Sequence, residues 1–113
     1  MNIFRNAEGS KRFAAGEVIF AAGDPGDCFY VVLEGAVTLS ADGRRFEDVG
    51  PGGIFGELAL LDAAPRSATA EAATDCDVVA LDERMFFAHI SQTPFFAITV
   101  MRIMADRLRR ATA

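Results

Sequence analysis

Turn signals recur through the first 80 residues of this 113-residue chain, and their regular spacing is the feature that most limits its fold. The intervals are mostly about 8–12 residues, which is typical of antiparallel β-sandwiches and β-barrels. Turn sequences stand at residues 23–26, 34–35, 42–43, 50–53, 64–65 and 74–75. A segment interrupted this often has no room for long helices, so the spacing predicts a mainly β architecture.

Runs of β-forming residues lie between these turns, at 17–21, 29–34, 36–41, 44–49, 67–72 and 76–81. In the third run Val37 and Leu39 alternate with polar residues, which predicts one buried face and one exposed face. Asp42-Gly43 then separates two such runs, and this dipeptide is a strong signal for a tight hairpin. The pattern therefore predicts short antiparallel strands.

The spacing of the apolar residues becomes helical after Leu81. Asp82 is suited to cap a helix, and Thr93-Pro94 interrupts that helix before a longer one over residues 94–110. This longer helix carries two apolar stripes: Ala97, Met101, Met104 and Leu108 form one, and Phe96, Val100 and Ile103 form the other. One stripe suffices to dock the helix, so the second predicts a partner, most simply another copy of the chain. A single broad face packed on its own domain is the alternative.

The net charge of −5 is unevenly distributed. Residues 1–92 hold seven Lys and Arg against fifteen Asp and Glu, whereas residues 93–113 hold four Arg against one Asp. Because nucleic acid phosphates need clustered cations, the acidic body argues against nucleic acid as a partner of this chain alone. The cations at the end of the chain suit the negative C-terminal end of a helix dipole.

Several functional classes are disfavoured by what the composition lacks. No apolar run approaches the roughly 18 residues of a membrane span, and no signal-peptide core is present, so a cytoplasmic location without membrane contact is expected. One histidine and the two separated cysteines, Cys28 and Cys76, make no metal motif, so no metal or cofactor is expected. A jelly-roll enzyme of the cupin type would need several histidines.

Residues 55–70 read FGELALLDAAPRSATA, and they hold one cation in an acidic setting. Between residues 46 and 83 there are nine acidic residues, and Arg66 is the only cation. Its planar guanidinium suits phosphate oxygens, and a helix start at Gly56 would offer free N–H groups to an anion. Glu57 would repel phosphate, so it should accept a hydrogen bond from a neutral donor such as a sugar hydroxyl. Together these residues indicate a nucleotide site, and a structural ion pair between Glu57 and Arg66 is the alternative.

The same stretch resembles the phosphate-binding cassette of the cyclic nucleotide-binding domain family. The family pattern of Phe-Gly-Glu-Leu/Met-Ala-Leu, a variable loop and Arg-Ser/Thr/Ala-Ala-Thr stands here at residues 55–60, 61–65 and 66–69. Residues 14–39 resemble the first half of the family's barrel, and 81–110 resemble its closing helices. The resemblance implies one domain over residues 1–113: an antiparallel β-jelly-roll barrel over 1–81, followed by two C-terminal helices over 82–113.

The resemblance also implies a role for each residue of the cassette. Glu57 would bind the ribose 2′-hydroxyl, Arg66 would bind the cyclic phosphate, and neighbouring backbone groups would surround both. The base would lie against apolar strand residues such as Phe46 and Val49, beneath the last helix around residues 102–110. The complete candidate set is Phe55, Gly56, Glu57, Leu58, Ala59, Arg66, Ser67 and Ala68.

The function that this resemblance implies is a regulatory sensor without enzymatic activity. The sensor would bind a cyclic nucleotide, with cAMP expected, and would signal by moving its C-terminal helices. Ser67 could also bind the exocyclic amine of guanine, which leaves cGMP as an alternative. Only three residues follow Arg110, so no DNA-reading helix-turn-helix is expected in this chain. A dimerisation module that has lost its ligand is the other alternative, and the presence of Glu57 and Arg66 argues against it.

Overall fold

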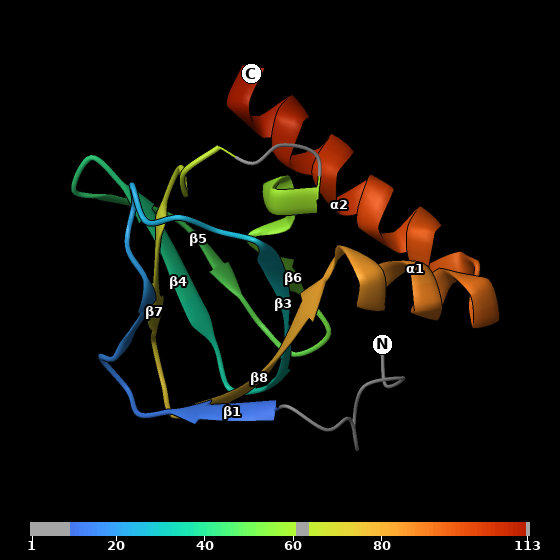
Figure 1. Cartoon of the computed structure of the whole chain (residues 1–113). Coiled ribbons are helices and arrows are strands. Elements are labelled where there is room, and N and C mark those ends of the chain that lie inside the picture. The colour runs from blue at the N-terminus through green and yellow to red at the C-terminus, as the bar shows by residue number, and fades with distance from the viewer. Residues whose placement is uncertain (1–9, 61–63, 113) are drawn as a thin grey trace.

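The computed structural model describes residues 10–60 and 64–112. Its strands form two antiparallel four-stranded sheets, and two helices follow on one side of them (Figure 1). The first sheet has the order β1 (Ser10–Phe13), β8 (Cys76–Asp82), β3 (Cys28–Glu34) and β6 (Ile54–Phe55). The second has the order β2 (Val18–Phe20), β7 (Thr69–Ala72), β4 (Val37–Ala41) and β5 (Arg44–Val49). The helical segments are a short 3₁₀ helix η1 (Glu57–Leu60), α1 (Glu83–Gln92) and α2 (Phe95–Thr112).

The predicted mainly β domain with two C-terminal helices is confirmed, with one correction: the sheets do not close into a barrel. The described strands pair only within their own sheet, so β1, β6, β2 and β5 remain edge strands. Each of the six predicted runs contains a strand. The sequence pattern missed β1 because its SKRF segment is largely exposed and charged, and it missed β6 because two residues show no period.

The predicted hairpin and its alternation are both present. Val37 and Leu39 are buried, whereas Thr38 and Ser40 between and after them are only partly covered. Asp42 and Gly43 have φ angles of 53° and 77°, as a two-residue turn between twisted antiparallel strands requires. Gly43 adopts such an angle without the steric cost that a side chain would bring. The β4–β5 hairpin therefore forms as the dipeptide predicts.

Strand β3 joins two hydrophobic clusters because its side chains alternate between the two faces of the sheet. On one face Tyr30 and Val32 pack into the cluster between the two sheets. On the other face Phe29 and Val31 pack into a second cluster, which α2 completes with its own apolar side chains. The sandwich thus fixes the position of α2 through the strand at its centre.

The two helices begin where the sequence predicts. The carboxylate of Asp82 accepts a hydrogen bond of 2.8 Å from the backbone N–H of Met85 and so caps α1. In α2 the stripe of Phe96 and Val100 docks on the sandwich, and each of these residues is 2% exposed. The other stripe is divided, since Met101 is 55% exposed whereas Met104 packs partly against the second cluster. Neither described helix is long and apolar enough to span a membrane.

Candidate ligand-binding site

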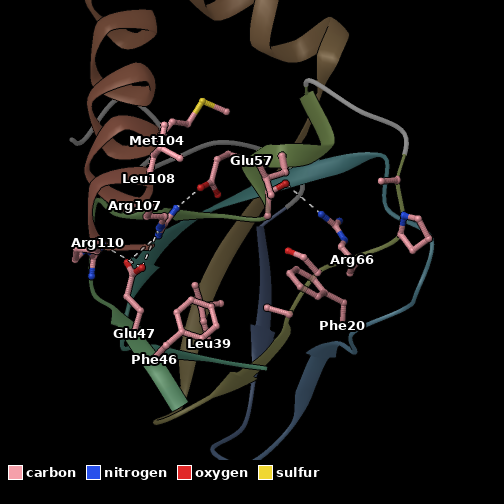
Figure 2. A pocket seen from close by; sticks show the side chains of 16 residues that line it. Phe20, Leu39, Phe46, Glu47, Glu57, Arg66, Met104, Arg107, Leu108 and Arg110 are labelled. Carbon is pink, nitrogen blue, oxygen red and sulfur yellow. Dashed lines mark hydrogen bonds and ion pairs between the residues drawn. The ribbon is translucent and has the colours of Figure 1, made fainter. Parts of the chain in front are cut away.

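A cavity of about 840 Å³ lies between the strands, η1 and α2 (Figure 2). Strand residues form one wall, the segment 56–58 with residues 64–68 forms another, and α2 covers the space. This volume lies within the range of about 300–1,000 Å³ that is usual for small-molecule sites. The side chains that carry its chemistry are Phe20, Leu39, Phe46, Glu47, Glu57, Arg66, Met104, Arg107, Leu108 and Arg110.

Most of the candidate residues from the sequence meet at this cavity. Its lining includes Gly56, Glu57, Leu58, Arg66, Ser67 and Ala68. Phe55 does not line it: this ring is fully buried and stacks on Tyr30 with 5.1 Å between centroids, so it supports the cassette from behind. Ala59 belongs to η1, but its side chain and residues 61–63 of the expected loop lie outside the described part. Of the two residues named for the base, Phe46 lines the cavity and Val49 is in the core between the sheets.

Arg66 is held by carbonyl oxygens and an aromatic ring rather than by a carboxylate of the described residues. It donates to the carbonyls of Gly56 at 3.1 Å and Cys28 at 2.7 Å, and its guanidinium lies 4.2 Å from the centroid of the Phe20 ring. Its Nε is buried and has no hydrogen-bond partner in the described parts of the chain. A buried donor without an acceptor is costly in free energy. Because Arg66 binds carbonyl oxygens and not Glu57, the alternative of a Glu57–Arg66 ion pair is wrong for the described structure.

Two glycines leave the space that the Arg66 side chain occupies. A Cβ added at Gly26 would collide with the guanidinium, and one added at Gly56 would lie 2.8 Å from Nη1. Gly56 also has a φ of 76°, an angle that side chains other than glycine rarely adopt. The local backbone is thus shaped around Arg66, which fixes its orientation at the cavity wall.

Glu57 is the most deeply buried charged residue of the site, at 6% exposure. Its Oε1 accepts a hydrogen bond of 2.5 Å from Nη1 of Arg107, which reaches the strands from α2. Arg107 also donates to both carboxylate oxygens of Glu47, each at 2.9 Å, and to the carbonyl of Ile54 at 2.6 Å. Arg110 adds a second cation at 3.2 Å from Glu47. Arg107 therefore connects α2 with β5, β6 and η1 at the cavity.

The protonation states of this network follow from competing effects. Burial alone would raise the pKa of Glu47 and lower that of Arg107. The hydrogen bonds and charges between Glu47 and the two arginines outweigh burial, so the pKa of Glu47 is lowered. The two carboxylates likewise raise the pKa of Arg107, and both partners keep their charge at neutral pH.

Arg107, Arg110 and Glu47 were not singled out by the sequence. The two arginines were explained as cations at a helix end, and Glu47 as one acidic residue among many. A signal was nevertheless available, because a buried Glu57 that does not pair with Arg66 needs another cation, and the last helix supplies several. The described residues contain no cluster of His, Cys, Asp and Glu that could hold a metal ion.

Comparison with known proteins assigns the chain to a family. The family described as the cyclic nucleotide-binding domain matches residues 10–93 of the chain. This chain belongs to the cyclic nucleotide-binding domain family. The match ends at Thr93, so α2 and its contacts with the cavity lie beyond it.

Several relatives of this cyclic nucleotide-binding domain carry the names of regulatory proteins. It is 46% identical to the cAMP-dependent protein kinase regulatory subunit of Eremothecium gossypii over 81 residues, which cover 72% of this chain and 18% of that protein. It is 34% identical over 106 residues to the CRP-like cAMP-activated global transcriptional regulator of Mycobacterium tuberculosis, covering 87% of this chain and 46% of the relative. The solved Thermus thermophilus catabolite activator protein aligns with a TM-score of 0.78 and 36% identity, covering 90% of this chain and 50% of that one. The domain spans half or less of each of these proteins.

Proposed function

We propose that this domain is a cytoplasmic sensor that binds a cyclic nucleotide, with cAMP as the preferred ligand. The observation that carries the proposal is Arg66, a cation at the cavity wall whose buried Nε lacks an acceptor in the described parts of the chain. A phosphate group in the cavity would complete the surroundings of this guanidinium, whose planar shape suits phosphate oxygens. The relatives named for cAMP support this choice of base.

The remaining cassette residues complete the proposed binding mode. Backbone N–H groups of Ser67 and Ala68 would assist Arg66 at the phosphate, and the backbone of residues 56, 58 and 59 would surround the ribose. Glu57 would accept the 2′-hydroxyl with the oxygen that Arg107 leaves available. The base would then lie against Phe46, with Met104 of α2 above it, since both line the cavity.

The charge of the cavity supports a ligand with one negative charge. Among the described residues, three arginines and two glutamates line it, so these side chains carry a net charge of +1 within a chain of −5. A cyclic phosphodiester has one negative charge and would neutralise the site, whereas a linear nucleoside monophosphate approaches two. We therefore expect the cyclic nucleotide to bind more tightly than the matching 5′-monophosphate.

Side-by-side calorimetric titration with cAMP, cGMP and 5′-AMP tests the proposal, with thermal unfolding as a second readout. We expect cAMP to bind most tightly, because its single charge suits the cavity better than that of 5′-AMP, and because adenine offers fewer polar groups than guanine to the apolar Phe46 and Met104. At about 100 times the dissociation constant, ligand should stabilise the fold by about 2.7 kcal/mol. Tighter cGMP binding would assign Ser67, which lines the cavity and is exposed, to the guanine amine. An unchanged melting curve with both cyclic nucleotides would favour the ligand-free dimerisation module.

We further propose that the domain signals by moving α2 and forms a homodimer through the outer side of this helix. Ile98 and Met101 are 39% and 55% exposed, one turn apart, although such side chains stabilise a fold mainly when they are buried. Only differential affinity for two positions of α2 would let the ligand move it. Met104 and Arg107 would provide this difference in affinity, because both belong to α2 and line the cavity, so a bound ligand would contact them in only one position of the helix.

The double substitution Ile98→Glu with Met101→Glu is expected to convert the dimer into a monomer. Each substitution would remove the favourable free energy of burying an apolar side chain at the interface, about 1.5–3 kcal/mol, and would place a carboxylate there. Leu108 is left unchanged because it lines the cavity. Sedimentation velocity measures the change, and Lys11→Glu, exposed on β1 and away from α2, serves as the control. A wild-type domain that sediments as a monomer at high concentration would contradict the dimer.

A further inference from the structure

Glu57 uses only one of its carboxylate oxygens within the described structure. Its Oε1 accepts from Nη1 of Arg107, and no described residue donates a hydrogen bond to its Oε2. A carboxylate that presents one oxygen to a cation and the other to the cavity can still accept a hydroxyl. The orientation of Arg107 decides how many oxygens of Glu57 remain available to a ligand. A guanidinium turned edge-on to Glu57 would form two parallel hydrogen bonds and occupy both of its oxygens.

Glu47 prevents that arrangement by taking the other edge of the guanidinium. Its two oxygens accept from Nε and Nη2 of Arg107, both at 2.9 Å, in the paired geometry that a carboxylate and an arginine prefer. The carbonyl of Ile54 accepts a further hydrogen bond from Nη2 at 2.6 Å. Only Nη1 is left for Glu57, as Figure 2 shows for the three side chains.

Burial makes this division of donors specific. The side chains of Arg107, Glu47 and Glu57 are 16%, 15% and 8% exposed. Water is therefore a poor substitute for any lost partner, and a guanidinium deprived of Glu47 would turn to the remaining carboxylate. Arg110, at 3.2 Å from Glu47, supplies a second cation and lets Glu47 stay ionised beside Arg107.

We infer that Glu47 is a positioning residue for ribose recognition: it holds Arg107 so that one oxygen of Glu57 stays available to the 2′-hydroxyl of the ligand. This inference rests on the proposed function, in which the ligand is a cyclic nucleotide. It adds a residue on β5, outside the cassette, to the machinery that distinguishes a ribose from a deoxyribose. Its partner Arg107 lies beyond the segment that matches the family.

The experiment compares cAMP with 2′-deoxy-cAMP by calorimetric titration of wild type and two matched variants. Glu47→Gln keeps the size of the side chain, but its amide presents a donor to Arg107 and breaks the paired geometry. Asp48→Asn is the control, because this substitution removes the same charge from the neighbouring residue. Asp48 lies outside the cavity lining, and its carboxylate accepts a hydrogen bond from the hydroxyl of Thr38. We expect wild type and Asp48→Asn to prefer cAMP by about tenfold, the usual effect of a hydrogen bond to a charged group. In Glu47→Gln the preference should fall below about threefold, mainly through weaker binding of cAMP.

The outcomes separate this inference from the proposed function. A wild-type domain that binds neither ligand overturns both. A wild type that prefers cAMP, with a Glu47→Gln variant that keeps the full preference, overturns the inference alone. Equal losses for both ligands would mean that Glu47 only stabilises the fold, which also overturns it. Arg107→Lys is the second variant, and it keeps the test open if Glu47→Gln folds poorly. Its ammonium retains the positive charge but cannot occupy both oxygens of Glu57 in parallel hydrogen bonds, so a preference for cAMP should persist, and its complete loss would overturn the inference.

Discussion

Arg66→Ala is expected to weaken cAMP binding by about 30-fold or more while the domain remains folded. Truncating one partner of a buried, hydrogen-bonded charge pair costs about 2–5 kcal/mol, and about 2 kcal/mol already corresponds to that loss of affinity. The fold should survive because Arg66 makes no ion pair with a described residue, and its contacts are two carbonyls and the Phe20 ring. Calorimetric titration measures the affinity, and circular dichroism measures the fold.

Two further substitutions show whether the effect belongs to Arg66 itself. Arg66→Lys keeps the charge but loses the planar donor pair, so its affinity should lie between those of wild type and Arg66→Ala. Arg44→Ala removes an exposed cation of β5 that does not line the cavity, and binding should be unchanged. An affinity loss below about threefold for Arg66→Ala would make Arg66 a structural residue.

Glu57→Gln is expected to weaken cAMP binding by about tenfold or more, and most of this effect should disappear with 2′-deoxy-cAMP. The reason is that the carboxylate is assigned to a neutral hydroxyl, which the deoxy ligand lacks. Because Glu57 also pairs with Arg107, some loss should remain with both ligands. Titration of both ligands against the variant measures the difference. Equal losses for the two ligands would show that Glu57 acts on α2 rather than on the ribose.

The cassette could be predicted from the sequence because its residues are close together in the chain. Glu57 and Arg66 are nine positions apart, so a local pattern already places both near one ligand. The same locality explains the predicted Asp82 cap and the turn at Asp42-Gly43, each of which depends on a few neighbouring residues.

The contacts of α2 could not be predicted in the same way. Glu47 and Arg107 are 60 positions apart, and Glu57 and Arg107 are 50 apart, so no local pattern connects them. Two apolar stripes were visible on the helix, but the sequence could not tell which one docks. In the structure Phe96 and Val100 dock, because they reach the outer face of β3 and β8 and complete the second hydrophobic cluster there.

The junction at Thr93 and Pro94 would be the pivot if α2 moves as proposed. With a rise of about 1.5 Å per residue, its 18 residues extend about 27 Å, and Arg107 lies about 20 Å from the pivot. A rotation of about 10° at the pivot would therefore shift Arg107 by roughly 3 Å, farther than a hydrogen bond can stretch. All four hydrogen bonds of Arg107 would break together, although Phe96 near the pivot would hardly move. If α2 moves as proposed, the strand framework would hold its near end through Phe96 while its far end changed between an attached and a released position.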